Sequence, residues 1–406
     1  MQTVNCQLLT TLSIEVQIAN CQLLTLTPPA IQKKYYLSPT MPLYMDVHIV
    51  PGVKARDVAE AHRKDILVQE QHECKCMTYW IDEERENIFC LIEAPNKEAV
   101  EEMHSKAHGL IPNKVIEVNS VLVESFLGRI YDPAEAEITQ DGLKVFADPS
   151  YRILLVIQTK DPVLLSHMLG NEKAKDLQQH HTSIVRKKIS QFGGREAEYE
   201  GNDFIVSFSS AHKAVLCALA IQKDLPSEVA VETGLRIGIN SGEPVSGSDN
   251  LFGDTIEFAS QLCSINSKCK LVISSAVKDL VAKERFENHA GQIASLAPQD
   301  ETVLQSIFTI LEKNWQNAAF SVDDFAKAMA MSTSQLYRKT VELFDHSPNT
   351  LLKEFRLQKA KELMKKRRYS ISQITFDAGF TSPSYFTKCF KKKFDLLPMA
   401  YIDLLH

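Results

Sequence analysis

Histidine and cysteine side chains with the spacing of metal ligands gather in the first third of the chain. His104 and His108 lie four residues apart in a helical pattern, so both imidazole rings project from one face of one helix. Any of three further donors could complete a nitrogen and sulfur site: His48, His62 and Cys90. Such ligands suit nickel or zinc. The alternative is an exposed histidine pair beside a buried cysteine.

A second set of functional side chains lies near the C-terminus, on two short helices that each follow a capped helix and a tight turn. The two units span residues 321–344 and 370–394. This layout is typical of helices that enter the DNA major groove. The side chains expected to face DNA are Thr333, Ser334, Gln335, Tyr337, Arg338, Ser382, Ser384, Thr387, Lys388, Lys391 and Lys392.

Individual roles follow from the geometry of these side chains. Arg338 and Gln335 match the edges of guanine and adenine, so we expect them to read bases. Lys391, Lys392 and Lys393 are expected to contact phosphates. Tyr385 is expected to pack largely inward with Phe386 and Phe390, with contact to a phosphate as the alternative for Tyr385. An ordinary solvated helix surface is the alternative for each exposed residue.

Positive charge is concentrated in this last quarter of the chain. Residues 303–406 contain 16 Lys and Arg against 10 Asp and Glu, whereas the whole chain has a net charge of −6. Phosphate contacts need lysine and arginine, so a basic end on an acidic body favours nucleic-acid binding there. A solvated charged surface is the alternative.

The composition is that of a folded protein with several domains. The 406 residues are 44% hydrophobic, which supports packed cores rather than disorder. The nine cysteines show no regular framework and are typical of reduced thiols in a cytoplasmic protein. The sequence has no run of about 18 apolar residues and no secretory signal, so we expect no contact with a membrane.

The elements that must position the metal ligands lie in residues 41–119. Residues 1–40 contain NCQLLT twice and are expected to be a disordered tail or a misassigned start. The following patterns alternate as strand, helix, strand, strand, helix, strand, which predicts a ferredoxin-like α+β fold. The stretches MDVHIVPG, FCLIEAPNKEAV and MHSKAHGL resemble a small family of nickel-binding ferredoxin-like domains. That resemblance implies nickel as the metal.

Residues 120–149 are expected to connect the first domain to a second, with strand-like pieces such as LVESFLG. Residues 150–297 show the strands and helices of an α/β domain. The stretches FGGREAEYEGNDFIVSF, LRIGINSGEPVSG and FGDTIEFASQLC resemble the catalytic domain of class III nucleotide cyclases. Such a domain pairs with a second copy, so the resemblance implies a dimer.

The cyclase resemblance makes catalysis testable residue by residue. Enzymes of this family hold two metal ions with two carboxylates, and these positions fall at Gln158, within about one residue, and at Asn202. Their transition-state Asn and Arg fall at Glu257 and Gln261. Amides cannot carry the charge that the metals need, and glutamine cannot replace arginine. We therefore expect an inactive domain, unless a register slip lets Asp161 and Asp203 hold metal.

Residues 303–406 closely resemble the DNA-binding domain of AraC-type transcription regulators. The resemblance covers both helix-turn-helix units and rests above all on ISQITFDAGFTSPSYFTKCFKKKF. Serines are expected to cap the helices, with capping boxes at Ser321–Asp324 and Ser370–Gln373. The expected core positions are Val322, Phe325, Ala326, Met329, Leu336, Val341, Phe344, Ile371, Ile374 and Ala378. The ending FDLLP departs from the family's FGxSP.

Taken together, the sequence predicts a multidomain chain: a ferredoxin-like α+β domain, a class III cyclase-like α/β domain and an all-α tandem helix-turn-helix. We expect a cytoplasmic regulator that binds double-stranded DNA, senses nickel or zinc and lacks enzyme activity. It is expected to form a homodimer through the cyclase-like or ferredoxin-like domain, or both. The alternatives are an active cyclase fused to a DNA-binding domain and a metal-buffering protein.

Overall fold

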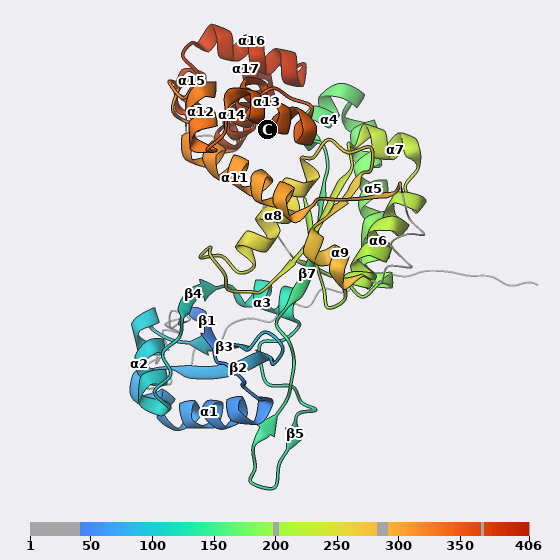
Figure 1. The fold of residues 1–406 in the computed structure, drawn as a ribbon. Helices are drawn as coiled ribbons and strands as arrows, with labels where there is room; N and C mark the ends of the chain where they lie inside the picture. The colour runs from blue at the N-terminus through green and yellow to red at the C-terminus, as the bar shows by residue number, and fades with distance from the viewer. Residues whose placement is uncertain (1–40, 198–202, 282–290, 367–368, 406) are drawn as a thin grey trace, which may run out of the picture. The chain divides into compact units, whose positions relative to one another are not determined.

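The computed structural model describes residues 41–197, 203–281, 291–366 and 369–405. The expectation for residues 1–40 and the position of Asn202 lie outside these residues. Two segments that contain sheets precede a run of helices (Figure 1). The predicted order of a ferredoxin-like α+β domain, a cyclase-like α/β domain and an all-α tandem helix-turn-helix is confirmed.

The first sheet belongs to the predicted βαββαβ unit. Its elements are β1 (Leu43–Ile49), α1 (Ala55–Val68), β2 (Lys75–Asp82), β3 (Asn87–Glu93), α2 (Lys97–Ala107) and β4 (Lys114–Val118). The four strands lie in the order β2-β3-β1-β4, and neighbouring strands are antiparallel. This order places β1 and β3 at the centre, between the edge strands β2 and β4.

Both faces of β1 are buried, although its sequence alternates between apolar and polar residues. Met45 packs in one core with Phe89 and Ile116. Tyr44 points to the opposite core, which contains Val58 of α1 and Met103 of α2. The polar residues on this second face therefore lie under helices and not in solvent.

The stretch LVESFLG, expected to contribute a strand-like piece, forms the end of helix α3 (Ser120–Leu127) instead. Asn119 caps this helix by accepting hydrogen bonds from Val121 N and Leu122 N. The apolar side of α3 is buried in the core that contains Met45 and Phe89 of the first sheet; its buried residues are Val123, Phe126 and Leu127. Apolar residues at i, i+3 and i+4 are the helical pattern, so the strand prediction used the wrong period. A two-stranded ribbon, β5 (Glu137–Ile138) and β6 (Lys144–Val145), follows.

The second sheet has six strands in the order β12-β11-β10-β7-β9-β8. Its strands are β7 (Arg152–Gln158), β8 (Arg195–Ala197), β9 (Phe204–Phe208), β10 (Arg236–Gly242), β11 (Leu271–Ile273) and β12 (Ile293–Ser295). Its helices are α4 (Pro162–Leu169), α5 (Asn171–Gln191), α6 (Ala211–Asp224), α7 (Ser227–Glu232), α8 (Gly253–Cys263) and α9 (Ser275–Leu280). The apolar run of β7 is buried throughout, which suits a central strand covered on both faces.

The chain ends in helices. They are α11 (Pro298–Asn314), α12 (Val322–Ala328), α13 (Thr333–Phe344), α14 (Pro348–Lys365), α15 (Ile371–Asp377), α16 (Pro383–Phe394) and α17 (Pro398–Leu404). Ser321 and Ser332 form capping boxes with Asp324 and Gln335. Ser370 accepts a hydrogen bond from Gln373 N, but only this half of the predicted box is present.

The predicted core of the two units is largely buried. Phe325, Ala326, Leu336, Phe344, Ile374 and Ala378 are buried, whereas Val322, Met329, Val341 and Ile371 are half-buried. The expectation that Tyr385 packs inward is wrong, because its side chain is 52% exposed. Phe386 and Phe390 are fully buried. Gly379 has a φ of 73°, as the tight turn before α16 requires. Within the described residues, no helix is both long and apolar enough to cross a membrane.

Candidate metal centre and nucleic-acid interface

His104 lies at the centre of a buried cluster between the helices and the first sheet. Asn96 caps α2 by accepting a hydrogen bond from Ala99 N, and His104 follows two turns later. Its Nε2 lies 3.0 Å from Asp46 Oδ2 on β1, and its Nδ1 lies 3.1 Å from Asp65 Oδ1 on α1. The ring thus bridges two carboxylates from different elements.

His108 joins the same cluster from the residue after α2. Its Nε2 lies 3.1 Å from Asp65 Oδ1 and 3.2 Å from His104 Nδ1. Leu110 N donates to its Nδ1, so Nε2 carries the proton of the neutral ring. The predicted projection of both histidines to one side is confirmed, although His108 sits at the C-cap and not inside the helix.

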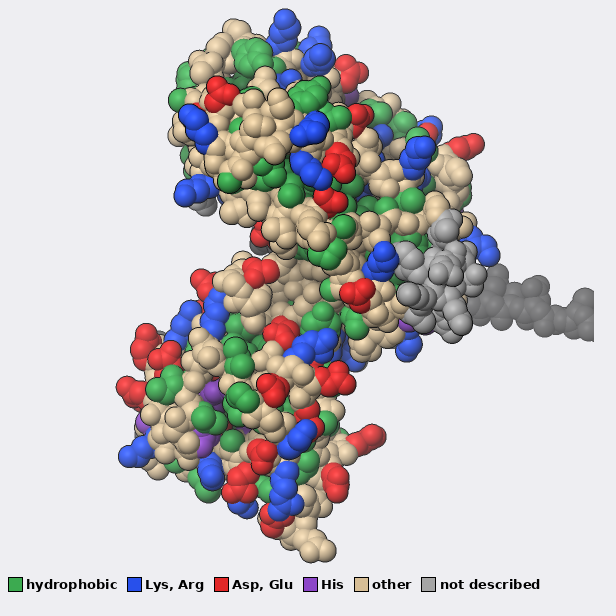
Figure 2. Space-filling view, viewed as in Figure 1, with side chains coloured by type: hydrophobic (Ala, Val, Ile, Leu, Met, Phe, Trp, Pro, Cys, Tyr) green, Lys and Arg blue, Asp and Glu red, His purple; other side chains and the backbone are tan. Residues whose placement is uncertain are grey.

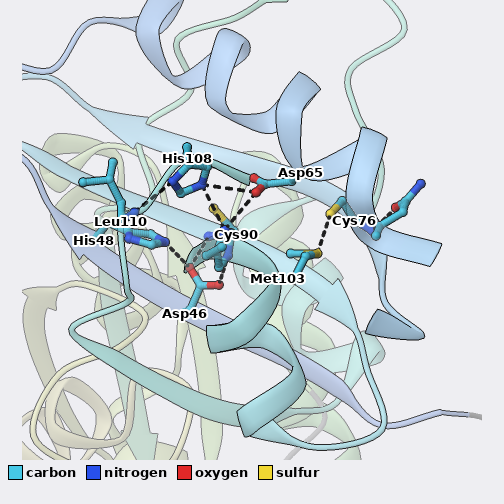
Figure 3. A network of polar contacts seen from close by, with 10 residues as sticks. Asp46, His48, Asp65, Cys76, Cys90, Met103, His108 and Leu110 are labelled. Atoms are coloured by element: carbon cyan, nitrogen blue, oxygen red, sulfur yellow. Dashed lines mark hydrogen bonds and ion pairs between the residues drawn. The ribbon is translucent and has the colours of Figure 1, made fainter. Parts of the chain in front are cut away.

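Strands β1 and β3 of the sheet supply a histidine and a thiol to the cluster. His48 and Cys90 point toward this cluster, close to Asp46 and His108 (Figure 3). One candidate ligand atom from each of Asp46, His48, Cys90 and His104 lies within 4.8 Å of the others. A metal held at about 2.0–2.3 Å from each ligand would place the ligands at most about 4.6 Å apart. The cluster is therefore already close to coordination distances.

The charges of this cluster are strongly coupled. Burial alone would lower the pKa of His104, but the carboxylates of Asp46 and Asp65 raise it to about 10. Burial alone would raise the pKa of Asp46, yet His104 and His48 hold it well below its usual range. Burial raises the pKa of the Cys90 thiol well above normal. The protein thus holds an imidazolium between two carboxylates, at the place where a cation would sit.

Among the residues that the structure describes, the donor set also leaves one buried nitrogen without a hydrogen bond. His48 is 4% exposed, and its Nε2 lies 3.3 Å from Asp46 Oδ1 outside hydrogen-bonding geometry. Together with two carboxylates, two further imidazoles and a thiol, this nitrogen fits a divalent transition metal. The five predicted ligands line one small cavity of about 20 Å³, which leaves room for a single ion or water.

One predicted imidazole, His62, and one further thiol, Cys76, stand apart. His62 lines the cavity but lies closer to Asp132, at 4.0 Å, and stacks edge-on against Tyr79. Cys76 Sγ lies 3.6 Å from Met103 Sδ, to one side of the cluster (Figure 3). Among the described residues, the groups with coordination spacing include neither His62 nor Cys76.

Two carboxylates of this cluster were not predicted from the sequence. Asp46 and Asp65 lie in the cluster and are 0% and 2% exposed. Asp46 precedes His48 by two residues, so the alternation of the strand already placed both on one face. Asp65 lies three residues after His62 on α1, which puts both on one side of that helix. These two spacings could have identified the carboxylates as candidate ligands. That α1 lies beside α2 could not be predicted from local spacing.

The first recognition helix, α13, presents a polar face. Thr333, Ser334, Gln335, Tyr337 and Arg338 are all exposed, whereas Leu336 is fully buried. Gln335 Oε1 accepts a hydrogen bond from Ser332 N at 2.8 Å within the capping box. Bidentate contact with adenine needs both ends of the amide, so this cap competes with the predicted role of Gln335.

The second recognition helix, α16, combines hydroxyl and basic groups. Ser382 caps the helix, Ser384 and Lys388 are exposed, and Thr387 is half-buried. In Figure 2, Lys and Arg side chains are prominent over the part of the molecule where Figure 1 places α16.

The basic residues of this interface differ in their partners. Lys393 pairs with Glu354 at 2.8 Å. Within the described part of the chain, Arg338, Lys391 and Lys392 form no ion pair. Their charges are therefore available to an external polyanion, whereas that of Lys393 is partly neutralised.

The cyclase-like positions that the structure describes hold no pair of free carboxylates. Gln158 Nε2 donates to Asp203 Oδ2 at 3.1 Å. Gln261 Nε2 donates to Glu257 Oε1 at 3.0 Å. Asp161 Oδ2 accepts from Tyr401 OH at 2.8 Å and lies 3.3 Å from Lys361 Nζ and from Lys365 Nζ.

Two family models match the parts that carry these sites. Residues 44–118 match a model described as nickel responsive protein SCO4226-like. Residues 325–403 match a helix-turn-helix domain model. The first range contains the whole histidine, carboxylate and cysteine cluster, and the second contains both recognition helices.

Three curated relatives are similar to longer stretches. "Histidine kinase P4" of Formosa agariphila is 38% identical over 283 residues, which are 66% of this chain and 20% of the kinase. "HTH-type transcriptional regulator GbdR" of Pseudomonas aeruginosa is 25% identical over 186 residues, or 45% of this chain and 48% of GbdR. "Putative adenylate cyclase 3" of Rhizobium meliloti is 26% identical over 140 residues, or 32% of this chain and 24% of that protein.

The chain thus spans less than half the length of each of these relatives. The two family models cover residues 44–118 and 325–403, on either side of the six-stranded domain. That middle domain is the part that resembles a nucleotide cyclase. The chain is thus similar to a SCO4226-like domain in its first part, to a helix-turn-helix domain in its last part, and over a further stretch to a putative adenylate cyclase.

Proposed function

We propose that this protein is a DNA-binding transcription regulator that responds to a divalent transition metal. The observation that carries the proposal is the pair of capped helices α13 and α16, whose outward faces offer unpaired basic side chains. The match of this region to a helix-turn-helix model supports DNA as the ligand. GbdR, the relative named as a transcriptional regulator, supports the same role.

In the DNA complex, each recognition helix lies in a major groove. Arg338 reads a guanine through its planar fork, and Lys388, Lys391 and Lys392 neutralise phosphates. Hydroxyl side chains of both helices contact bases or the DNA backbone: Thr333, Ser334, Tyr337, Ser382, Ser384 and Thr387. Gln335 stabilises the start of α13 through its cap. Tyr385, which is exposed, adds a phenol hydroxyl to this surface.

We propose that the metal binds at the buried cluster around His104. His48, Cys90, His104 and His108 offer nitrogen and sulfur ligands, and Asp46 and Asp65 offer oxygen. When bound, a divalent ion supplies the positive charge that protonated His104 supplies in the free protein. Nickel is the metal we propose, because of the model matched by residues 44–118. Zinc is the alternative, since the same donors suit it.

We further propose that the middle domain does not cyclise nucleotides. Asp161 and Asp203, which could hold metal after a register slip, are occupied by other partners. Asp161 is held by Lys361, Lys365 and Tyr401, and Asp203 accepts a hydrogen bond from Gln158. Glu257 and Gln261 bond to each other and offer no positive charge to a triphosphate.

The remaining organisation is proposed as follows. Residues 41–406 form one compact unit, within which we place domains at 41–119, 150–297 and 303–406. A homodimer through the cyclase-like or ferredoxin-like domain would present two copies of the DNA-binding region to paired half-sites. We also propose a cytoplasmic location, which the proposed DNA ligand supports.

In vitro selection from fragmented genomic DNA tests this function. The purified chain should enrich a defined set of fragments that share one motif. Arg338→Ala should lose the shared motif, whereas Lys339→Ala should keep it, because Lys339 is already paired with Asp300 and Glu342. Enrichment without any common motif, or identical motifs from all three proteins, would contradict the assignment.

A further inference from the structure

A cleft of about 500 Å³ opens in the cyclase-like domain, with none of the metal-cluster residues in its lining. It lies where the segment after β7 meets α5 and the strands β8 and β9. The described residues that matter in its lining are Lys160, Leu165, His181, Thr182, Asp203 and Phe204. Small-molecule sites in proteins are typically clefts of about 300–1,000 Å³, and this cleft falls within that range.

His181 on α5 is a buried polar side chain in this lining. It is 3% exposed, and its Nε2 has no hydrogen-bond partner among the described residues. Burial lowers the pKa of His181, so the ring is neutral at pH 7 and Nε2 can donate one hydrogen bond. Leaving such a nitrogen unpaired costs about 1–3 kcal/mol, so a partner from outside the protein is favoured.

Lys160 provides a cation at the same cleft. Its side chain is exposed and forms no ion pair with a described residue. Arg186, the other cation of the lining, is already held by Glu196 through contacts of 2.9 Å. Asp203 of the same lining already accepts a hydrogen bond from Gln158 Nε2 at 3.1 Å. Lys160 is therefore the charge available to a ligand.

The cleft also has an apolar wall. Leu165 of α4 is buried, and Phe204 of β9 is half-buried. The centroids of the Phe204 and His181 rings are 6.1 Å apart. A flat apolar group can pack against this wall and lose its hydration, while its polar end stays near the cation and the imidazole.

We propose that this cleft binds a small organic carboxylate with a flat, apolar body. The carboxylate accepts one hydrogen bond from His181 Nε2 and pairs with Lys160 Nζ. The body packs against Leu165 and Phe204. None of these four residues belongs to the metal cluster or to the proposed DNA-facing side chains, and the site gives the cyclase-like domain a ligand without requiring catalysis.

Nuclear magnetic resonance of the full chain with labelled histidine tests the proposal. The chain has 12 histidines, so a His181→Gln sample assigns the His181 signal. Three probes separate the parts of the ligand: benzoate has both a carboxylate and a flat body, acetate has only the carboxylate, and benzyl alcohol has the body without charge. Benzoate should shift the His181 signal and bind at least about tenfold more tightly than either of the others.

Two variants locate the carboxylate. Lys160→Gln, at an exposed position that should not disturb folding, should weaken benzoate binding by about tenfold or more. Lys187→Gln, at an exposed lysine on α5 outside the lining, should leave it unchanged. The proposal is overturned if benzoate does not shift His181, if Lys160→Gln binds it as well as the wild type, or if acetate or benzyl alcohol binds as tightly as benzoate.

Discussion

The buried imidazolium of His104 predicts an unusual dependence of stability on pH in the absence of metal. The carboxylates of Asp46 and Asp65 raise the pKa of His104 to about 10 in the folded protein, against about 6.5 in an unfolded chain. A group whose pKa is raised by folding stabilises the fold fully below its unfolded pKa. That stabilisation is lost as the pH rises through the folded value.

The size of the effect follows from these two pKa values. Linkage gives a loss of about 3 kcal/mol in the free energy of unfolding between about pH 7 and pH 9.5. A substitution that removes the imidazolium should lower the free energy of unfolding already at neutral pH. His104→Gln leaves two buried carboxylates without a cation, which should cost about 3–5 kcal/mol and remove most of the alkaline loss.

Trp80 provides the assay, because it lies fully buried in β2 of the ferredoxin-like domain. The chain has two tryptophans, so a Trp315→Phe background leaves Trp80 as the only tryptophan. Urea unfolding is followed by the fluorescence of Trp80, with EDTA present, at about pH 7 and at about pH 9.5. Two proteins are compared: the Trp315→Phe variant and the same variant with His104→Gln added. Equal alkaline losses with and without His104 would refute the reasoning, as would constant stability of the parent protein.

Three further predictions concern the other surfaces. Arg338→Ala should weaken specific DNA binding by about 1–3 kcal/mol in titrations of a selected fragment, with Lys339→Ala as the unchanged control; an equal loss in both would contradict a base contact. Lys391→Ala should reduce the slope of log K against log salt by about 1. Lys393→Ala should reduce this slope less, because Lys393 already pairs with Glu354. Equal slopes for the two variants would contradict this difference. Purified protein with Mn²⁺ should form no cyclic nucleotide from ATP or GTP, and clear turnover would show that the Gln158 and Gln261 positions do not prevent catalysis.

The C-terminal helices could be predicted from local sequence signals. The caps at Ser321 and Ser332 and the positive φ of Gly379 depend on residues a few positions apart. Tyr385 was misplaced because the apolar spacing of α16 includes a tyrosine that the fold leaves 52% exposed. A large aromatic ring at a helical position does not by itself show which side the core occupies.

The metal cluster shows where sequence reasoning loses information. The pair His104 and His108 could be found, because their spacing is local. That Asp46 and Asp65 contact the same ring could not, because this depends on α1 and α2 packing on one face of the sheet. Likewise, LVESFLG was expected to form a strand, since a short apolar run does not distinguish a buried strand from a buried helix.

The central claim is that metal bound at the His104 cluster changes DNA binding by the helix-turn-helix region. The most direct test is the dissociation constant of the full chain for one selected DNA fragment, measured with and without nickel at fixed salt. We expect a change of about fivefold or more in the wild type, and no change in the double variant His104→Gln, His108→Gln, which should still bind DNA. An identical dissociation constant with and without nickel in the wild type would contradict the account, as would an equal nickel effect in the double variant.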